Sequence, residues 1–297
     1  MKSKKIALIA ALTSIFFLTG CNDDKKETDK TQAQARILKI GAIPNPEEEA
    51  VLETAQQQAK ELYNIEVQFV DFSDYVTPNQ ALNDGLIDIN IFQHKPYLDQ
   101  QIKERGLNLT VVGNTFVYPI ASYSKKLRPI TSDSQISDDG IVVTSPRGEK
   151  YFIRSGSTIA IPNDPTNLGR ALLLLQHEGF ITVDKNKGLL PTTVDITSNP
   201  YNINILELEA PMLPRSLDDD QVDLAVINNT FAGKVNLTSS KDGIFVEDKD
   251  SPYVNIIVAR ENNKNDPIVI DFVKAYQTEA VAKKADEVFH GDAVKGW

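Results

Sequence analysis

A short motif and the three histidines are the first places to look for chemistry in this chain. Ser122 and Lys125 have the Ser-x-x-Lys spacing of serine acyl-transferring enzymes. That tetrapeptide falls in an extended run instead of opening a helix, and the chain has no Lys-Thr-Gly, Gly-x-Ser-x-Gly or phosphate-binding glycine-rich loop. His94, His177 and His290 are far apart in the sequence, which disfavours a histidine-rich metal site. We therefore expect neither an enzyme nor a protein that holds a metal or another cofactor.

The only cysteine, Cys21, offers a different chemistry, and it has no partner for an intrachain disulfide. Three of the first five residues are lysines, and an apolar run over residues 6–17 leads to a small-residue exit at Thr19-Gly20, which predicts a signal peptide over residues 1–20. The apolar run is shorter than the roughly 20 residues of a membrane-spanning helix. The place of Cys21 resembles the lipobox of bacterial lipoproteins, which implies a new N-terminus that carries lipid such as palmitate. A chance cysteine in a signal peptide that is cut elsewhere is the alternative.

The composition of the remaining chain limits its partners. Residues 22–36 are polar and lack aromatic and branched aliphatic side chains, so residues 21–36 are expected to form a lipidated cysteine and a flexible stalk. The formal charge of the chain is −10, and loss of the three N-terminal lysines leaves 28 basic against 41 acidic residues, a charge of −13. Such an acidic body does not suit nucleic acid, because phosphate neutralisation supplies most of that affinity.

Along the body, strand-like and helix-like patterns alternate. Extended segments are expected at 37–42, 65–69, 87–91, 107–112, 116–123, 157–161, 203–208, 222–227 and 251–258. Helices are expected to begin at Asn45-Pro46 and near Pro96, to run through residues 170–176, and to follow the last strand from about Ile268. This alternation predicts an α/β fold.

The pattern restarts near residue 157, which favours two lobes over one continuous sheet. We expect the first lobe to comprise residues 37–120 plus 250–297 and the second to comprise residues 121–249, with the two crossings acting as a hinge. Residues 131–156 are rich in serine and aspartate and predict a hairpin inserted on the surface. In open α/β sheets ligands bind beyond the carboxyl ends of strands, so a cleft is expected between the lobes.

Three longer motifs carry a resemblance to a known family: FQHKPYL at 92–98, IPNDPTNLGR at 161–170 and SPYVN at 251–255. Together with GNTFVYP at 113–119, the segment 206–217 and AVKGW at 293–297, they resemble the methionine-binding lipoproteins of the MetQ/NlpA family over nearly the whole mature body. The resemblance implies a periplasmic-binding-protein fold whose lobes close over a free amino acid, methionine. It also implies delivery to an ABC permease with its ATPase subunit, from a lipid anchor on the cell membrane facing the periplasm or the exterior.

Positions that match the family imply a ligand-binding set of seven residues: Tyr75, Phe92, His94, Tyr97, Arg170, Asn228 and Asn255. Arg170 has a planar fork that can hold a carboxylate by two hydrogen bonds, although an arginine is more often paired with a protein acid. The aromatic residues would form a slot for a thioether, and the two asparagines carry donors and acceptors for a zwitterion. His94 is expected to contact the ligand, and the partner of the ammonium group stays open.

The sequence is also compatible with two other functions. An anchored adhesin or structural lipoprotein would have the same acidic, exported body, and detection of one bound amino acid per chain would argue against it. A binding protein of the same fold could also take a methionine-containing dipeptide or another apolar amino acid, because one methylene changes binding by only about 1–3 kcal/mol.

Overall fold

The structure, a computed structural model, describes residues 36–132, 134 and 137–297. The predicted signal peptide, Cys21 and residues 22–35 of the predicted stalk lie outside the described residues. Arg36, the last residue assigned to the stalk, already belongs to the first strand of a sheet. Within the described residues, no helix is long and apolar enough to cross a membrane.

The first lobe is built on a six-stranded sheet with the strand order β15-β4-β14-β3-β1-β2. Its strands are β1 (Arg36–Ala42), β2 (Ile65–Asp71), β3 (Ile89–His94), β4 (Leu109–Val117), β14 (Val254–Arg260) and β15 (Val294–Lys295). Strand β1 is parallel to β2 and β3, whereas β14 is antiparallel to both β3 and β4. The six-stranded sheet therefore contains both β1 from the start of the body and β14 and β15 from its last residues.

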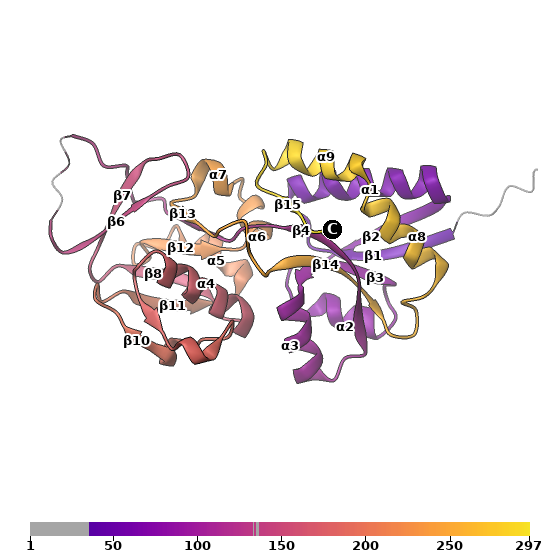
Figure 1. Cartoon of the computed structure of the whole chain (residues 1–297), viewed down its shortest axis with the longest axis horizontal. Helices are drawn as coiled ribbons and strands as arrows, with labels where there is room; N and C mark the ends of the chain where they lie inside the picture. The colour runs from indigo at the N-terminus through magenta and orange to yellow at the C-terminus, as the bar shows by residue number, and fades with distance from the viewer. Residues whose placement is uncertain (1–35, 133, 135–136) are drawn as a thin grey trace, which may run out of the picture. The chain divides into compact units, whose positions relative to one another are not determined.

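Helices cover both faces of this sheet (Figure 1). One face packs against α1 (Pro46–Tyr63), α8 (Pro267–Tyr276) and α9 (Glu279–Val288), and the other against α2 (Thr77–Asn83) and α3 (Lys95–Arg105). Successive side chains of a strand point to opposite faces of the sheet, so β14 contributes apolar side chains to both faces. Ile257 and Ala259 join the core below α1, whereas Ile256 and Val258 pack with residues of α2 and α3.

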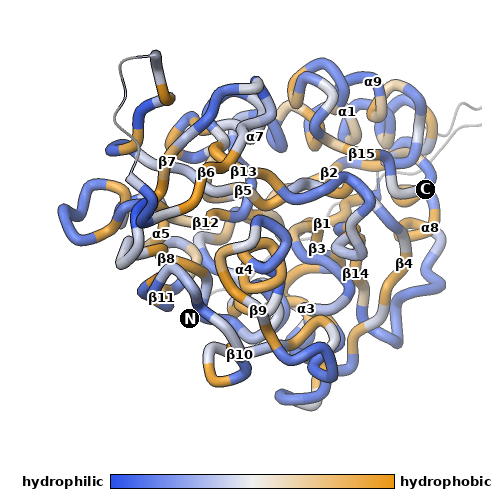
Figure 2. The backbone as a smooth tube through the Cα atoms, turned by 60° about the vertical axis from the view of Figure 1, so that its left-hand side comes forward, coloured by the Kyte–Doolittle hydropathy of each residue, from blue (hydrophilic) through white to orange (hydrophobic). Residues whose placement is uncertain are grey.

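The second lobe has a five-stranded sheet with the order β11-β8-β12-β5-β13. Its strands are β5 (Ala121–Tyr123), β8 (Thr158–Pro162), β11 (Asn204–Leu208), β12 (Leu224–Ile227) and β13 (Phe245–Val246), and its helices are α4 (Pro165–His177), α5 (Leu213–Ser216), α6 (Asn229–Gly233) and α7 (Ser239–Asp242). Leu224 and Val226 face the core with α4, and Ala225 and Ile227 face α5 and α6. In Figure 2 the hydrophobic stretches follow the strands, and the hydrophilic ones gather in the outer loops.

Shorter elements complete the second lobe. An antiparallel pair, β6 (Gly140–Thr144) and β7 (Lys150–Arg154), lies within residues 131–156, and Val143, Tyr151 and Ile153 bury their side chains in the core of this lobe. The segment is thus packed against the lobe and not merely laid on its surface. A second pair is β9 (Thr182–Val183) with β10 (Ile196–Ser198), and the single-turn 3-10 helices are η1 (Lys185–Lys187), η2 (Thr193–Asp195) and η3 (Ala210–Met212).

The chain passes between the two sheets twice, over residues 118–120 and 247–253. The helix starts expected at Pro46 and Pro96 are confirmed, and α4 ends next to Gly179, which adopts φ +84°. The predicted α/β fold with two lobes is confirmed. Hinge motion at the two crossings stays a prediction.

Candidate functional site

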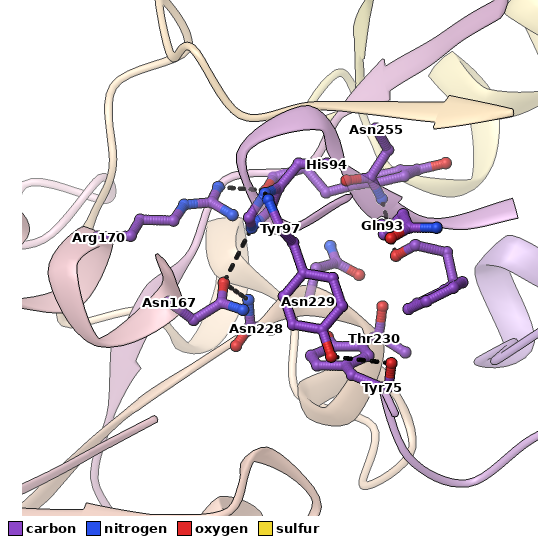
Figure 3. Close-up of a pocket in the computed structure, with 12 residues that line it drawn as sticks. Tyr75, Gln93, His94, Tyr97, Asn167, Arg170, Asn228, Asn229, Thr230 and Asn255 are labelled. Carbon is purple, nitrogen blue, oxygen red and sulfur yellow. Dashed lines mark hydrogen bonds between the residues drawn. The ribbon is translucent and has the colours of Figure 1, made fainter. Parts of the chain in front are cut away.

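A cavity lies where the two lobes face each other across the crossings (Figure 3). About 360 Å³ of space lies between its lining atoms, a volume that includes space open to solvent. All seven residues of the predicted set line it, together with five that the sequence did not single out: Gln93, Tyr118, Asn167, Asn229 and Thr230. Segments far apart in the sequence therefore converge on one site.

Arg170 is held on the wall of this cavity by α4, with only 4% of the residue exposed. Its Nε donates to Oε1 of Glu247 at 2.9 Å, its Nη2 donates to Oε2 of the same carboxylate, and Nη2 also donates to the Tyr118 carbonyl at 2.9 Å. The Tyr253 ring centroid lies 4.5 Å from the guanidinium carbon. The guanidinium group is thus hydrogen-bonded to Glu247 and to the Tyr118 carbonyl at its edges, and one of its faces lies on the Tyr253 ring.

This pairing corrects the expected geometry of Arg170. The sequence predicted that its fork would hold a ligand carboxylate, but the Nε–Nη2 fork holds Glu247, which lies 77 residues away at the second crossing. Among the described residues, Nη1 has no hydrogen-bond acceptor, and the arginine lines the cavity. A ligand carboxylate would therefore meet Nη1 of an arginine whose position Glu247 already sets.

Asn167 joins the two lobes at the centre of the site. Its backbone N–H and its Nδ2 both donate to the Asp164 carboxylate, which caps α4, at 3.0–3.1 Å. The amide is thereby oriented with Oδ1 towards the cavity, where it meets His94 Nε2 at 3.2 Å and accepts from Asn228 Nδ2 at 2.8 Å. Asn167 precedes Arg170 by three residues, so both side chains lie on one face of α4.

His94 caps a helix and has no free ring nitrogen. Its Nδ1 accepts from the Tyr97 backbone N–H at 3.2 Å, so the ring proton must sit on Nε2, which donates to Asn167. Burial, with the charge of Arg170 next, lowers the pKa of His94 to about 3, and the ring is therefore neutral. The ligand contact expected of His94 would involve its ring edge, because both nitrogens are occupied by the protein.

Three aromatic rings make an apolar wall opposite these polar groups. Tyr75, in the loop before α2, stacks on Phe92 at 5.8 Å between centroids and is tilted against Tyr97 at 5.9 Å. The Tyr97 hydroxyl donates to the Tyr75 carbonyl at 2.9 Å, and Phe231 of α6 supports Tyr75 from the second lobe at 4.9 Å. The three aromatic residues expected from the sequence are thus in contact with one another, and a thioether slot between them stays a prediction.

Asn228 presents an open acceptor. It is the N-cap residue of α6 and is 7% exposed, and its Nδ2 is committed to Asn167. Its buried Oδ1 has no hydrogen-bond partner within residues 36–132, 134 and 137–297. A buried oxygen without a donor is costly, so a ligand that brings an N–H to this point would be favoured. Within the described part of the chain, the side chain of Asn255 on β14 makes only a long hydrogen bond, from Nδ2 to the Phe92 carbonyl at 3.5 Å.

The NlpA lipoprotein family model matches residues 38–146 and 151–297. The chain belongs to the NlpA lipoprotein family. It is 52% identical to the D-methionine-binding lipoprotein MetQ of Salmonella typhimurium, over all of this chain and 99% of the relative. A crystal structure of the methionine-binding protein MetQ matches with a TM-score of 0.78 and 53% identity, covering 88% of this chain and 98% of that one. A nutrient-binding protein of Burkholderia cenocepacia, solved bound to methionine, matches with a TM-score of 0.76 and 39% identity, covering 88% and 100%.

Within this NlpA-family fold, the serine-enzyme alternative has no support. Ser122 is fully buried on β5, and Lys125 reaches away to an ion pair with Asp218 on the surface. The described residues contain no group of three histidine, cysteine, aspartate or glutamate side chains that could hold a metal ion. The NlpA family is one of substrate-binding proteins of ABC transporters, which is a non-enzymatic role.

Proposed function

We propose that this protein captures free methionine between its lobes and passes it to the permease of an ABC importer. The cavity supports this, because it sets an apolar aromatic wall against an arginine and an amide acceptor, which suits a zwitterion with a long apolar side chain. The names of the relatives agree with this ligand.

In this proposal each end of methionine has its own partner. The carboxylate meets Nη1 of Arg170, and the ammonium group donates to Oδ1 of Asn228. The thioether lies against Tyr75, Phe92 and Tyr97, where each sulfur–ring contact contributes about 0.3–1.5 kcal/mol. His94 and Asn167 orient Asn228 and take no direct part in the ligand's hydrogen bonds.

Ligand contacts to both lobes would favour a closed state, which then docks on the permease while the ATPase subunit drives transport. Native mass spectrometry of the purified full-length protein is expected to detect one bound methionine per chain. For the variant Cys21→Ser in solution, small-angle scattering should show compaction when L-methionine is added. If no amino acid is bound and methionine leaves the scattering unchanged, this function is wrong.

The same measurement separates the other ligands of this class. A methionine-containing dipeptide must fit the same cavity and place a second backbone unit against its polar residues. Calorimetric titrations with methionine, leucine and glycyl-methionine are expected to rank methionine first. A tighter complex with the dipeptide would assign the cavity to peptides instead.

We also propose that lipid on Cys21 anchors the protein to the membrane. Replacement of Cys21 with serine is expected to move the protein from the detergent phase to the aqueous phase in a two-phase separation. The affinity for methionine should be unchanged, because the cavity lies entirely within residues 75–255. A variant that stayed in the detergent phase would contradict the anchor without affecting the proposed ligand.

A further inference from the structure

Two hydrogen-bonded contacts join the start of α1 in the first lobe to α6 in the second. Asn45 Nδ2 donates to the Asn229 carbonyl at 3.3 Å and to Asn229 Oδ1 at 3.1 Å, and the Thr230 hydroxyl donates to Glu48 Oε1 at 3.2 Å. Asn229 and Thr230 line the methionine cavity (Figure 3). Asn45 and Glu48 do not, and neither belongs to the ligand-binding set expected from the sequence.

The local structure of α1 directs both side chains towards α6. Asn45 is the N-cap residue, and its Oδ1 accepts from the Glu48 backbone N–H at 2.8 Å, so its Nδ2 must point away from the helix. Gly233 at the end of α6 allows the approach, because a Cβ there would lie only 2.5 Å from Asn45 Nδ2. The contact therefore depends on a residue without a side chain at this position.

We propose that Asn45 and Glu48, with Asn229 and Thr230, form an interlobe clasp that sets how long the closed protein retains its ligand. The proposal rests on the methionine-binding function proposed above. Because Asn229 and Thr230 follow directly after Asn228, the clasp holds the segment that presents the open acceptor to the cavity. Asn45 and Glu48 are thus positioning residues outside the cavity lining, whereas Asn229 and Thr230 belong both to the clasp and to the lining.

Glu48 makes the clasp sensitive to pH. Burial raises its pKa to about 7, against smaller lowering contributions from the Thr230 hydroxyl, the Asn45 backbone and the charge of Lys234, while Glu47 raises it further. The other titratable groups that face it are the phenols Tyr75, Tyr118 and Tyr276, whose pKa values are themselves raised, so they are neutral. Lys234 is the cation whose charge lowers the pKa of this carboxyl group.

Protonation of Glu48 is coupled to closure of the cleft, because its pKa differs between the open and closed forms. Opening of the cleft would return Glu48 to water and to a pKa near 4.5, so the closed form binds the proton more tightly. The extra stability of the closed form is complete below about pH 4.5 and is lost as the pH rises through about 7. Methionine affinity should therefore fall, on the order of 10- to 100-fold, between pH 5 and pH 8.

The test uses stopped-flow dissociation of L-methionine from the full-length protein in detergent, at pH 5 to 8, for Glu48→Gln, Asn45→Asp and Thr230→Val. Asparagine-to-aspartate keeps the helix cap but removes the donor to Asn229. We expect Asn45→Asp and Thr230→Val to speed dissociation about two- to tenfold with little change in association, as for the loss of one hydrogen bond. Glu48→Gln should abolish the pH dependence and slow dissociation at pH 8.

Glu53→Gln is the matched control, since Glu53 lies exposed on the same helix and should leave rates and pH profile unchanged. The clasp is overturned if Asn45→Asp and Thr230→Val dissociate at the wild-type rate, or if Glu48→Gln keeps the pH slope. It is also overturned if Glu48→Gln weakens methionine but not 4-(methylthio)butanoate, which lacks only the ammonium group, because Glu48 would then bind that group. Failure of the wild-type protein to bind methionine would instead refute the proposed function.

Discussion

Replacement of Arg170 with alanine is expected to abolish methionine binding at ordinary concentrations. Removal of one partner of a desolvated charge pair costs about 2–5 kcal/mol, a factor of roughly 30 to several thousand in affinity. The variant loses Nη1, which is the proposed carboxylate donor, and it also leaves the Glu247 carboxylate, 14% exposed, beside the Ile120 N–H without its cation. Isothermal titration calorimetry measures the affinity, and a value within threefold of wild type would overturn the assignment.

Two further variants separate the ligand contact from the structural pair. In Arg170→Ala/Glu247→Gln the orphaned charge is gone, so thermal stability should recover relative to Arg170→Ala while methionine binding stays lost. Arg147→Ala is the control for an arginine in an ion pair, because Arg147 binds Glu149 and the Tyr151 hydroxyl in the β6–β7 hairpin. That variant should bind methionine with wild-type affinity.

Much of the fold could be predicted because many of its helices and strands depend on local sequence patterns. Alternating side chains mark β1, a run of residues with high strand propensity marks β14, and Asn45-Pro46 marks the start of α1. Each signal depends on residues within a few positions of one another. The hairpin at residues 140–154 shows the limit of such patterns. Its strands could be expected, but the burial of Ile153 in the second lobe depends on residues that are distant in sequence.

The site was only partly predictable for the same reason. The seven residues of the expected ligand-binding set follow from positions that match the family, and all of them line one cavity in the structure. The partner of Arg170 could not be foreseen, because Glu247 reaches it only through the chain's second crossing. Asn167 lies within the motif IPNDPTNLGR, and its spacing of three residues from Arg170 is a sequence signal that places both side chains on one face of a helix.

The tautomer of His94 is a further property that no sequence pattern contains. It follows from two contacts at once, the Tyr97 N–H on one ring nitrogen and the Asn167 oxygen on the other. The orientation of the Asn228 amide is fixed in the same way, because its nitrogen must face the Asn167 oxygen. A chain of hydrogen bonds from Asp164 to Asn228 therefore decides which atom the ligand meets.

Replacement of Asn228 with alanine is expected to weaken methionine binding by about 1.5–3 kcal/mol, or roughly 10- to 150-fold, because a hydrogen bond to a charged group is lost. The loss should depend on the ammonium group. Wild-type protein should strongly prefer methionine to 4-(methylthio)butanoate, and the preference should shrink in Asn228→Ala, where the acceptor is missing.

Calorimetry with both ligands on both proteins closes a thermodynamic cycle, and its coupling energy isolates the contact between Asn228 and the ammonium group. Asn263→Ala is the matched control, because Asn263 is also buried with an unpartnered Oδ1 among the described residues but lies outside the cavity. It should lower thermal stability, through loss of its bond to the Asp88 carbonyl, and leave the ligand preference intact. Equal weakening of both ligands by Asn228→Ala would show that Asn228 does not bind the ammonium group, and the open acceptor would then need another donor.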